Sequence, residues 1–550
     1  MHGGVKVYRG AAGAARTYVG ADRSRADDYY LSEGTGVARR YAATGLGPVV
    51  ELPALDGEAY EAWVAGVDPE TGQPRGRLRT DEHAVRFLEV VVNGPKSWSL
   101  AAELHPDVAA AYEAAQDRAA TEIIGWLAQH MTTRVGPRGG QVAVPLDRVE
   151  AAVVRHYTSR AGDPHRHLHL QVNARVFAAG RWRGIDTVAV RDSIAAINGV
   201  GHAAVVCDPA FRTALAGHGY TLDASGEIGQ LASYIGPFSR RAAQIGRHID
   251  RYETEWSAAH PGEQPGPALR RSWDARAWAE DRPDKVTPRP GADLHRRWLD
   301  ELAGLGFHGR HPPVPLAPPW VGRIDRDQAA GEVLARLGAA RSAWNAADIR
   351  GEVEQLLART GIVADPVVRR ELAEDLTARA LARCLLLLAR AGVPEHVRAL
   401  TSQHVLDVAA DLAGRLAVRG ADPAAGIQAA VVRDRLAATA GGTGLDAGQA
   451  AAVAALAGDR ALVVVEGVAG AGKTTTLAAT RDLLDEQEHR LVVVTPTLRA
   501  AKAAAAEIGA PAGSAAWLAH QHGWRWTDTG TWTRLDAGDP DRVTGRYYSG

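Results

Sequence analysis

The chain has 550 residues, a formal net charge of −1 and an apolar fraction of 46%. This length allows several domains with separate cores, and the balanced charge indicates a soluble globular protein while excluding an obviously basic nucleic-acid binder. Two cysteines, Cys207 and Cys384, are too few for a disulfide framework. The sequence shows neither a signal peptide nor an apolar run long enough to span a membrane, so we expect a cytoplasmic location.

Three tyrosines lie close together near the N-terminus. Tyr29 and Tyr30 are adjacent in an Arg/Asp-rich segment, and Tyr18 lies upstream of them. A tyrosine phenol can attack phosphorus when the phosphate is polarised and the proton is taken up. Tyrosines at the start of a helix are also ordinary core aromatics. The segment by itself leaves both interpretations open.

The next informative segment, residues 87–99, reads as a strand, a Gly-Pro turn and the start of an alanine-rich helix over Leu100–His130. Glu89 is a carboxylate in an otherwise apolar strand. We expect it to hold a metal-ligand histidine or to accept a proton, the alternative being an edge-strand glutamate facing water. Lys96 and Ser97 stand where they could contact a phosphate, or where a helix simply begins.

Three histidines follow in two neighbouring alternating segments. In residues 167–173 polar and apolar residues alternate, so a strand would place His167 and His169 on one face and leucines on the other. His156 lies in a second alternating run, and the turn-forming residues 159–164 bring the two strands side by side. Imidazoles from adjacent strands can hold a divalent cation, with Mg, Mn and Zn all compatible. The alternative is a set of half-exposed strand histidines.

Residues 1 to about 310 resemble the relaxase domain of TrwC/TraI-type (MobF) conjugative relaxases, which belong to the HUH endonuclease group. Most members have Asp where this chain has Glu89. The matching motifs are Asp27-Asp28-Tyr29-Tyr30, Gly94-Pro95-Lys96-Ser97, His156-Tyr157-Thr158-Ser159-Arg160, Asp163-Pro164, His167-Leu168-His169 and Ile235-Gly236-Pro237-Phe238-Ser239-Arg240-Arg241.

The resemblance implies an α+β fold with an antiparallel sheet and a divalent metal held by His156, His167 and His169. It also implies that a tyrosine, Tyr29 before Tyr30 and Tyr18, nicks single-stranded DNA at an origin of transfer, leaving a 5′-phosphotyrosyl link that is later resealed. Accessory relaxosome or secretion coupling proteins are the implied partners. A rolling-circle replication initiator would use the same chemistry. A DNA groove could involve Arg240, Arg241, Arg247 and Arg251, although a solvated helix face explains them equally well.

The chain changes character past residue 310. A Pro-rich segment within residues 311–324 is expected to act as a linker. Residues 325–440 have helical spacing and form a helical middle region without identifiable chemistry. Residues 441–444, Gly-Gly-Thr-Gly, then form a flexible joint before a last domain over 441–550.

The last domain contains a phosphate-binding loop, Gly467-Val-Ala-Gly470-Ala-Gly472-Lys473-Thr474. We expect a buried strand before it and a helix after it, with its backbone N–H groups and Lys473 contacting ATP phosphates and Thr474 holding Mg.

The segment around Gln449 resembles the adenine-reading part of RecD-like helicases. No apolar strand ending in an Asp-Glu pair follows the loop, and Asp485-Glu486 lies within the next helix. We therefore expect an incomplete α/β helicase domain of a longer relaxase-helicase, with weak or no ATP hydrolysis. A nucleotide-dependent DNA-binding module would need only the loop. Four tryptophans could stack on DNA bases or pack in a core: Trp517, Trp524, Trp526 and Trp532.

Overall fold

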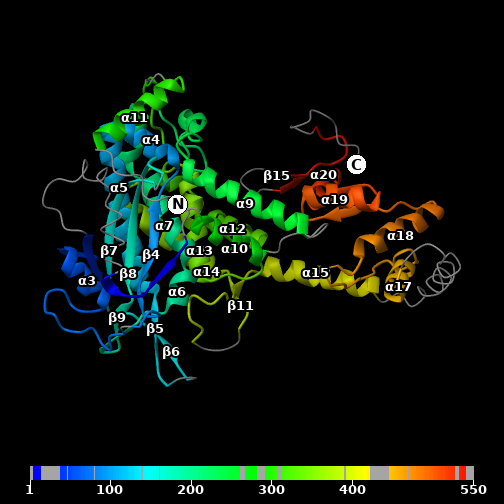
Figure 1. Cartoon of the computed structure of the whole chain (residues 1–550), viewed down its shortest axis with the longest axis horizontal. Coiled ribbons are helices and arrows are strands. Elements are labelled where there is room, and N and C mark those ends of the chain that lie inside the picture. Colours follow the sequence, from blue (N-terminus) through cyan, green and yellow to red (C-terminus); the bar gives the residue numbers. More distant parts are fainter. Residues whose placement is uncertain are drawn as a thin grey trace. The chain divides into compact units, whose positions relative to one another are not determined.

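The computed structural model in Figure 1 describes residues 4–13, 38–45, 47–79, 81–137, 140–159, 161–259, 267–280, 291–307, 309, 311–388, 392–420, 445–468, 470–526 and 532–540. The chain divides into two compact units. The first unit comprises Met1–Ile245 and Asp281–Val405, and the second comprises Gly246–Glu280 and Leu406–Gly550.

A six-stranded antiparallel sheet forms the centre of the first unit, with the strand order β1-β4-β8-β7-β2-β3. Strands β7, β8 and β4 lie side by side in Figure 1. The mixture of this sheet with many helices confirms the predicted α+β class. The strands are β1 (Lys6–Arg9), β2 (Ala38–Ala43), β3 (Val50–Leu55), β4 (Val85–Asn93), β7 (Val149–Thr158) and β8 (Pro164–Asn173).

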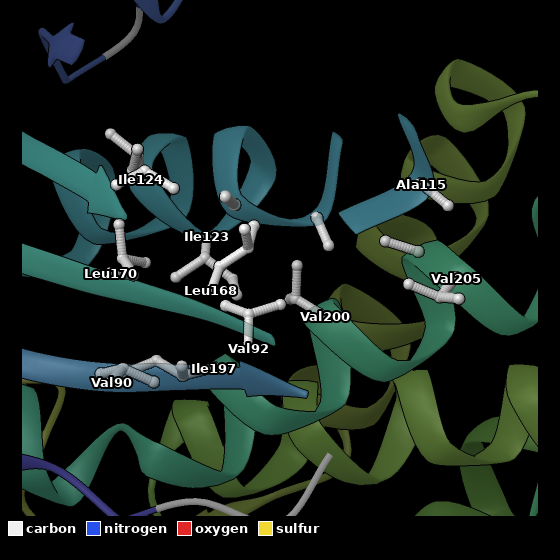
Figure 2. Packing of buried hydrophobic residues seen from close by; sticks show 14 of the residues in the cluster. Val90, Val92, Ala115, Ile123, Ile124, Leu168, Leu170, Ile197, Val200 and Val205 are labelled. Atoms are coloured by element: carbon white, nitrogen blue, oxygen red, sulfur yellow. The ribbon is translucent and has the colours of Figure 1, made fainter. Parts of the chain in front are cut away.

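The two faces of the sheet differ because side chains alternate along each strand. Leu168 and Leu170 of β8 are fully buried on the face covered by α5 (Pro106–His130) and α7 (Ile194–Val206). Figure 2 shows Val92 of β4 and Leu168 close to Ile123 of α5 and Val200 of α7. The histidines of β8 consequently point to the opposite face, as the alternation in the sequence predicts.

The single helix predicted over Leu100–His130 is wrong. The structure has α4 (Lys96–Leu104) followed by α5, with His105 in an extended conformation between them. Pro106 causes the break, because proline lacks the N–H that a continuous helix would use but fits the first turn of a new one.

Helix α3 (Gly57–Ala65) covers the other face of the sheet. The Asp56 carboxylate caps it by accepting from the N–H of Ala59, and Tyr60 and Trp63 are fully buried. The Trp63 indole donates to Glu150, a buried carboxylate of β7 that also pairs with Arg40 and Arg75. Because an unpaired buried charge is costly, these contacts fix the position of α3 on the sheet.

Smaller elements complete the part of the first unit that surrounds the sheet. Helix α9 (Arg240–Ala259) begins in this unit and continues into the second. The others are the hairpins β5 (Thr132–Val135) with β6 (Val142–Pro145) and β9 (Arg175–Ala178) with β10 (Arg181–Gly184), the helices α6 (Thr187–Asp192), α8 (Pro209–Gly217) and α11 (Gly291–Gly304), and the 3-10 helix η1 (Gly229–Tyr234).

A further helical layer packs against α7. It starts after the Pro-rich segment and the 3-10 helix η2 (Val321–Arg323), and it contains α12 (Arg326–Ala340), α13 (Ala346–Thr360) and α14 (Pro366–Ala382), followed by the short pair β11 (Leu385–Leu386) and β12 (Leu400–Thr401). Helices α7 and α13 cross at two glycines. A Cβ atom on Gly351 would lie 2.5 Å from the backbone of Ala195, and one on Gly199 would lie 2.8 Å from the Gly351 carbonyl oxygen.

Buried ion pairs hold this helical layer to the sheet-covering helices. Arg369 of α14 lies 2.6 Å from Glu354 of α13 and also pairs with Glu122 of α5. All three side chains are almost completely buried. The middle region is therefore packed with the first unit up to residue 405.

The second unit contains the phosphate-binding loop. Its elements are α10 (Pro267–Ala279), most of α15 (Gln403–Gly420), α17 (Ala447–Leu456), α18 (Lys473–Glu486), α19 (Leu498–Ile508), α20 (Ala515–Gln521), the parallel pair β13 (Val493–Thr495) with β14 (Ala512–Ser514), and the antiparallel pair β15 (Trp524–Trp526) with β16 (Trp532–Arg534). The residues of α15 are exposed over most of its length.

In the described parts of the chain, no single helix is long and apolar enough to cross a membrane, whereas the bent pair α7 and α8 passes that test by length and composition alone.

The glycine crossing of α7 and α13 gives a test of the packing. We expect Gly351→Ala to lower the free energy of unfolding by about 1–3 kcal/mol, because its methyl group would overlap the backbone of Ala195. Gly331→Ala in α12 is the matched control, since its nearest neighbour would be Arg383 Nη1 at 3.6 Å. That change should raise stability by about 0.5–1 kcal/mol through helix propensity. Urea unfolding of both variants measures the difference, and equal effects would contradict the close crossing.

Candidate metal centre and nucleotide loop

Three imidazoles converge on the α3 face of the sheet. His156 of β7 is paired directly with His167 of β8, and His169 follows two residues later on the same face. One ring nitrogen from each lies within 4.8 Å of the others. His156 and His167 are only 6% and 8% exposed, so the interpretation of these residues as half-exposed strand histidines is wrong.

The hydrogen-bond partners orient two of these rings for a cation. His167 Nδ1 lies 2.8 Å from the His165 carbonyl oxygen, which can only accept, so Nδ1 carries the proton and Nε2 carries a lone pair. His169 Nδ1 faces the Glu89 carboxylate, which favours the same tautomer. The two Nε2 atoms are 3.2 Å apart. Two nitrogens bound to one tetrahedral ion at about 2.0 Å would be separated by about 3.3 Å, so the donor set fits a divalent metal.

Glu89 belongs to an interior strand and is 4% exposed, which excludes a water-facing edge glutamate. Its Oε1 lies 3.3 Å from His169 Nδ1, and its Oε2 accepts a hydrogen bond of 3.1 Å from Gln171 Nε2. Burial alone would raise the pKa of the Glu89 carboxyl, but His169, Gln171 and Lys6 hold it below its usual value. Glu89 is therefore an ionised partner of a candidate metal ligand.

Residues at the start of α4 lie beside the same hairpin. Lys96 Nζ donates to the Pro164 carbonyl oxygen at 2.8 Å, and burial lowers the pKa of its ammonium group to about 8 although the Asp163 carboxylate opposes that shift. Ser97 is buried, and its Oγ accepts from the backbone N–H of Ile228. Both side chains thus make internal contacts that hold the structure around the hairpin.

His165 extends the row of imidazoles on β8. Its ring stacks on His167 with the centroids 4.5 Å apart. Burial, reinforced by His167, Lys96 and His169, holds the pKa of His165 well below its usual value. A neutral ring at this position adds no positive charge next to the candidate cation site.

The turn between β7 and β8 is held from outside by two helices. Asp163 accepts from the backbone N–H and the guanidinium of Arg240, at the start of α9. The Gly162 carbonyl oxygen accepts from Trp298 and Arg297 of α11. Arg240 also pairs with Glu301. These contacts show Arg240, one of the arginines suggested for a DNA groove, in a role that positions the metal-ligand hairpin.

The candidate nucleophiles Tyr18, Tyr29 and Tyr30 lie outside the described residues. The strands on either side of them are nevertheless informative. Strand β1 pairs with β4 and strand β2 pairs with β7, so they flank the strands that carry Glu89 and the three histidines.

The phosphate-binding loop ends at the first residue of α18, as predicted. Gly470 and Gly472 have φ values of 78° and 70°, a left-handed conformation that glycine adopts without strain. Lys473 Nζ donates to the carbonyl oxygens of Gly467 and Val468 at 2.9 and 2.7 Å. Gln449 Nε2 donates to the Ala471 carbonyl oxygen at 3.1 Å, which brings the predicted adenine-reading residue next to the loop.

The buried strand predicted before the loop is not formed. Residues 462–468 have no hydrogen-bonded neighbouring strand among the residues that the structure describes, and the side chain of Val464 is 77% exposed. An isolated strand has no partner for its backbone groups, and β13 pairs with β14 instead. Asp485-Glu486 ends α18, as expected. The four candidate stacking tryptophans are 38–49% exposed, so they are not buried in a core.

Comparison with known proteins finds two matching families in different parts of the chain. The TrwC relaxase family matches residues 12–305, which is more than half of the chain. The chain belongs to the TrwC relaxase family. An AAA domain family matches residues 444–539, which fits a helicase-like, ATP-binding region. A search of curated proteins found no match.

Several solved structures of TrwC are similar to the relaxase part. A metal-free structure of conjugative relaxase TrwC with OriT DNA is 21% identical, with a TM-score of 0.39, and covers 56% of this chain and 99% of its own. The metal-bound complex is 21% identical, with a TM-score of 0.40 and coverages of 56% and 100%. A complex with a 27-mer DNA that comprises the recognition hairpin and cleavage site is 20% identical, with the same TM-score and coverages.

Sequence reasoning missed Gln171 and Tyr60 at this candidate metal site. Gln171 continues the alternation of His167 and His169, which was a usable signal. Tyr60 offered none, because its contact with Gln171 joins residues 111 positions apart.

Metal binding by the relaxase region can be tested directly. We expect His167→Ala to lower affinity for Mn²⁺ by more than the roughly 10- to 100-fold that loss of an outer partner costs, since it removes a ligand. His83→Ala, at an exposed position, should leave the affinity unchanged. Isothermal titration calorimetry provides the measurement. Unchanged binding by the His167 variant would refute the assignment.

Proposed function

We propose that this chain is a conjugative relaxase that nicks one DNA strand at an origin of transfer and later reseals it. The observation that carries the proposal is the convergence of His156, His167 and His169 within the region matched by the relaxase family. Single-stranded DNA is the proposed substrate, and accessory relaxosome or secretion coupling proteins are the proposed partners. The cytoplasmic location expected from the sequence belongs to the same proposal.

The proposed reaction exchanges one phosphate ester for another. The phenol oxygen of an N-terminal tyrosine, with Tyr29 the first candidate, forms a bond to phosphorus. The bond from phosphorus to the 3′ oxygen breaks, and that oxygen leaves as a hydroxyl group. A divalent cation held by the three histidines would polarise the phosphate oxygens. Because the number of ester bonds is unchanged, the reverse reaction reseals the strand.

Glu89 is proposed to hold His169 rather than to accept the tyrosine proton. Both of its oxygens face protein groups, His169 Nδ1 and Gln171 Nε2. A carboxylate in this position keeps the proton on Nδ1 and leaves Nε2 for the cation. A group other than Glu89 is therefore proposed to take up the tyrosine proton, which overall is transferred to the departing 3′ oxygen.

The C-terminal region is proposed to bind ATP with Mg. The loop glycines, including Gly467, Gly470 and Gly472, allow the backbone to approach the phosphates, while Lys473 supplies positive charge and Thr474 a ligand for Mg. Gln449 beside the loop is the proposed contact for the adenine ring. We also propose that residue 310 ends the relaxase domain, that residue 324 ends the linker and that residue 440 ends the helical middle region.

A covalent-adduct assay tests the nicking reaction. We expect Tyr29→Phe to reduce the adduct with an origin-of-transfer oligonucleotide by at least about tenfold, because nucleophilic attack needs the phenol oxygen. Tyr30→Phe and Tyr18→Phe should have smaller effects. Tyr41→Phe is the control, since Tyr41 is buried in the core on the α5 face of the sheet. Gel electrophoresis under denaturing conditions measures the adduct, and full adduct formation by every N-terminal variant would reject the assigned nucleophiles.

We expect the chain to bind ATP but to hydrolyse it weakly or not at all. Lys473→Ala should weaken ATP binding by roughly tenfold or more through loss of a phosphate contact, whereas Lys502→Ala on the exposed side of α19 should not. Turnover should be weak or absent, because β13 and β14 do not end in an Asp-Glu pair. Fluorescence titration with a labelled nucleotide and a phosphate-release assay measure the two properties. Steady turnover by the purified chain would contradict this expectation.

A further inference from the structure

A buried chain of hydrogen-bonding groups leads from α3 to the metal-ligand histidines. Tyr60 Oη donates to Gln171 Oε1 at 2.7 Å, Gln171 Nε2 donates to Glu89 Oε2 at 3.1 Å, and Glu89 Oε1 lies 3.3 Å from His169 Nδ1. Tyr60, Gln171 and Glu89 are 0%, 1% and 4% exposed. These hydrogen-bonded side chains therefore lie where water does not compete for the same donors and acceptors.

The hydrogen bonds between Tyr60, Gln171 and Glu89 all run in one direction, from donor to acceptor. The NH₂ group of the Gln171 amide faces Glu89 and donates to its Oε2, and the amide carbonyl oxygen faces Tyr60. The Tyr60 hydroxyl then has to donate to that carbonyl. Each of these three side chains thus has one orientation that satisfies the hydrogen-bonding groups of its neighbours.

The contact between Glu89 and His169 is the weakest in the series. A separation of 3.3 Å is beyond the usual range for an N–H···O hydrogen bond, so this contact alone holds the carboxylate loosely. The shorter contacts at the other end orient Gln171, which in turn holds Oε2 of Glu89. Strand pairing supports this arrangement, because Glu89 and Gln171 lie directly opposite each other in the sheet.

We propose that Gln171, oriented by Tyr60, is a positioning residue that holds Glu89 against His169 and thereby sets the affinity of the three-histidine site for a divalent metal. The proposal rests on the proposed function only in assigning a metal to that site. Gln171 makes no contact with the metal in this scheme. It acts on the direction in which the His169 ring presents Nε2.

Metal affinity of the purified full chain, without DNA, provides the test. We expect Gln171→Met, which removes the amide but keeps the volume, to weaken Mn²⁺ binding by roughly 10-fold or more, the lower end of the loss typical for outer partners of metal ligands. Tyr60→Phe should weaken it by a smaller factor. The visible spectrum of bound Co²⁺ should shift in both variants, because the geometry of one ligand changes.

Asn173→Leu is the matched control. Asn173 is a buried amide on the same face of β8. Its Nδ2 donates to the Trp63 carbonyl oxygen of α3 and its Oδ1 accepts from the Arg175 backbone N–H, so neither of these hydrogen bonds involves Glu89. It therefore reports the cost of loosening α3 on the sheet. We expect its Mn²⁺ affinity and Co²⁺ spectrum to remain those of the unmodified chain.

A double-mutant cycle shows whether Gln171 acts through Glu89. In a Glu89→Ala background, Gln171→Met should cause no further loss of affinity, because the group that it orients is gone. The proposal is overturned if Gln171→Met binds Mn²⁺ as tightly as the unmodified chain, if Asn173→Leu loses as much, or if the loss persists without Glu89. Should Gln171→Met fail to fold, as judged by circular dichroism, Tyr60→Phe carries the same decision.

The proposed function fails separately. Variants that lose metal affinity as described, in a chain that forms no DNA adduct, would reject the relaxase reaction while supporting the positioning role. Normal nicking together with unchanged metal affinity in the Gln171 variant would reject the positioning role while supporting the relaxase reaction.

Discussion

The antiparallel pairing of β7 with β8 is the interaction on which the candidate metal centre depends. It places His156 opposite His167, and the period of two along β8 adds His169 to the same face. A slip of one residue would move every side chain of one strand to the other face. The fully buried Leu168 and Leu170, packed between α5 and α7, oppose such a slip because it would exchange them with imidazoles. The burial of the apolar face of β8 thus fixes the strand register and keeps the histidines on the opposite face.

The turn of the same hairpin is restrained by charge as well as by packing. Asp163 is almost fully buried and pairs with Arg240, while the Gly162 carbonyl oxygen is held by α11. These contacts come from residues far along the chain. They connect the position of the histidines to the folding of the whole first unit, so that the ligands are held by a scaffold and not by the hairpin alone.

Local patterns in the sequence were enough to locate the histidines and Glu89, since alternation along a strand depends only on neighbouring residues. The break at Pro106 also has a local cause, because proline cannot continue a helix, whereas the alanine-rich residues on either side favour the single long helix that was predicted. The exposed segment before the phosphate-binding loop was not predictable in this way, because apolar residues such as Val464 form a buried strand only when neighbours pair with it. Tyr60 could not be found either, since its role arises from the docking of α3 on a distant strand.

The ion pairs between α14 and α5 have a consequence for how this protein can be shortened. The family match ends at residue 305, yet Glu122 of the matched region faces Arg369 beyond it. A fragment cut at the family boundary would leave that carboxylate without its counter-charge and would expose to water the face of α7 around Gly199 that α13 covers. The smallest piece of this chain that preserves the native surroundings of α5 and α7 therefore extends to about residue 405.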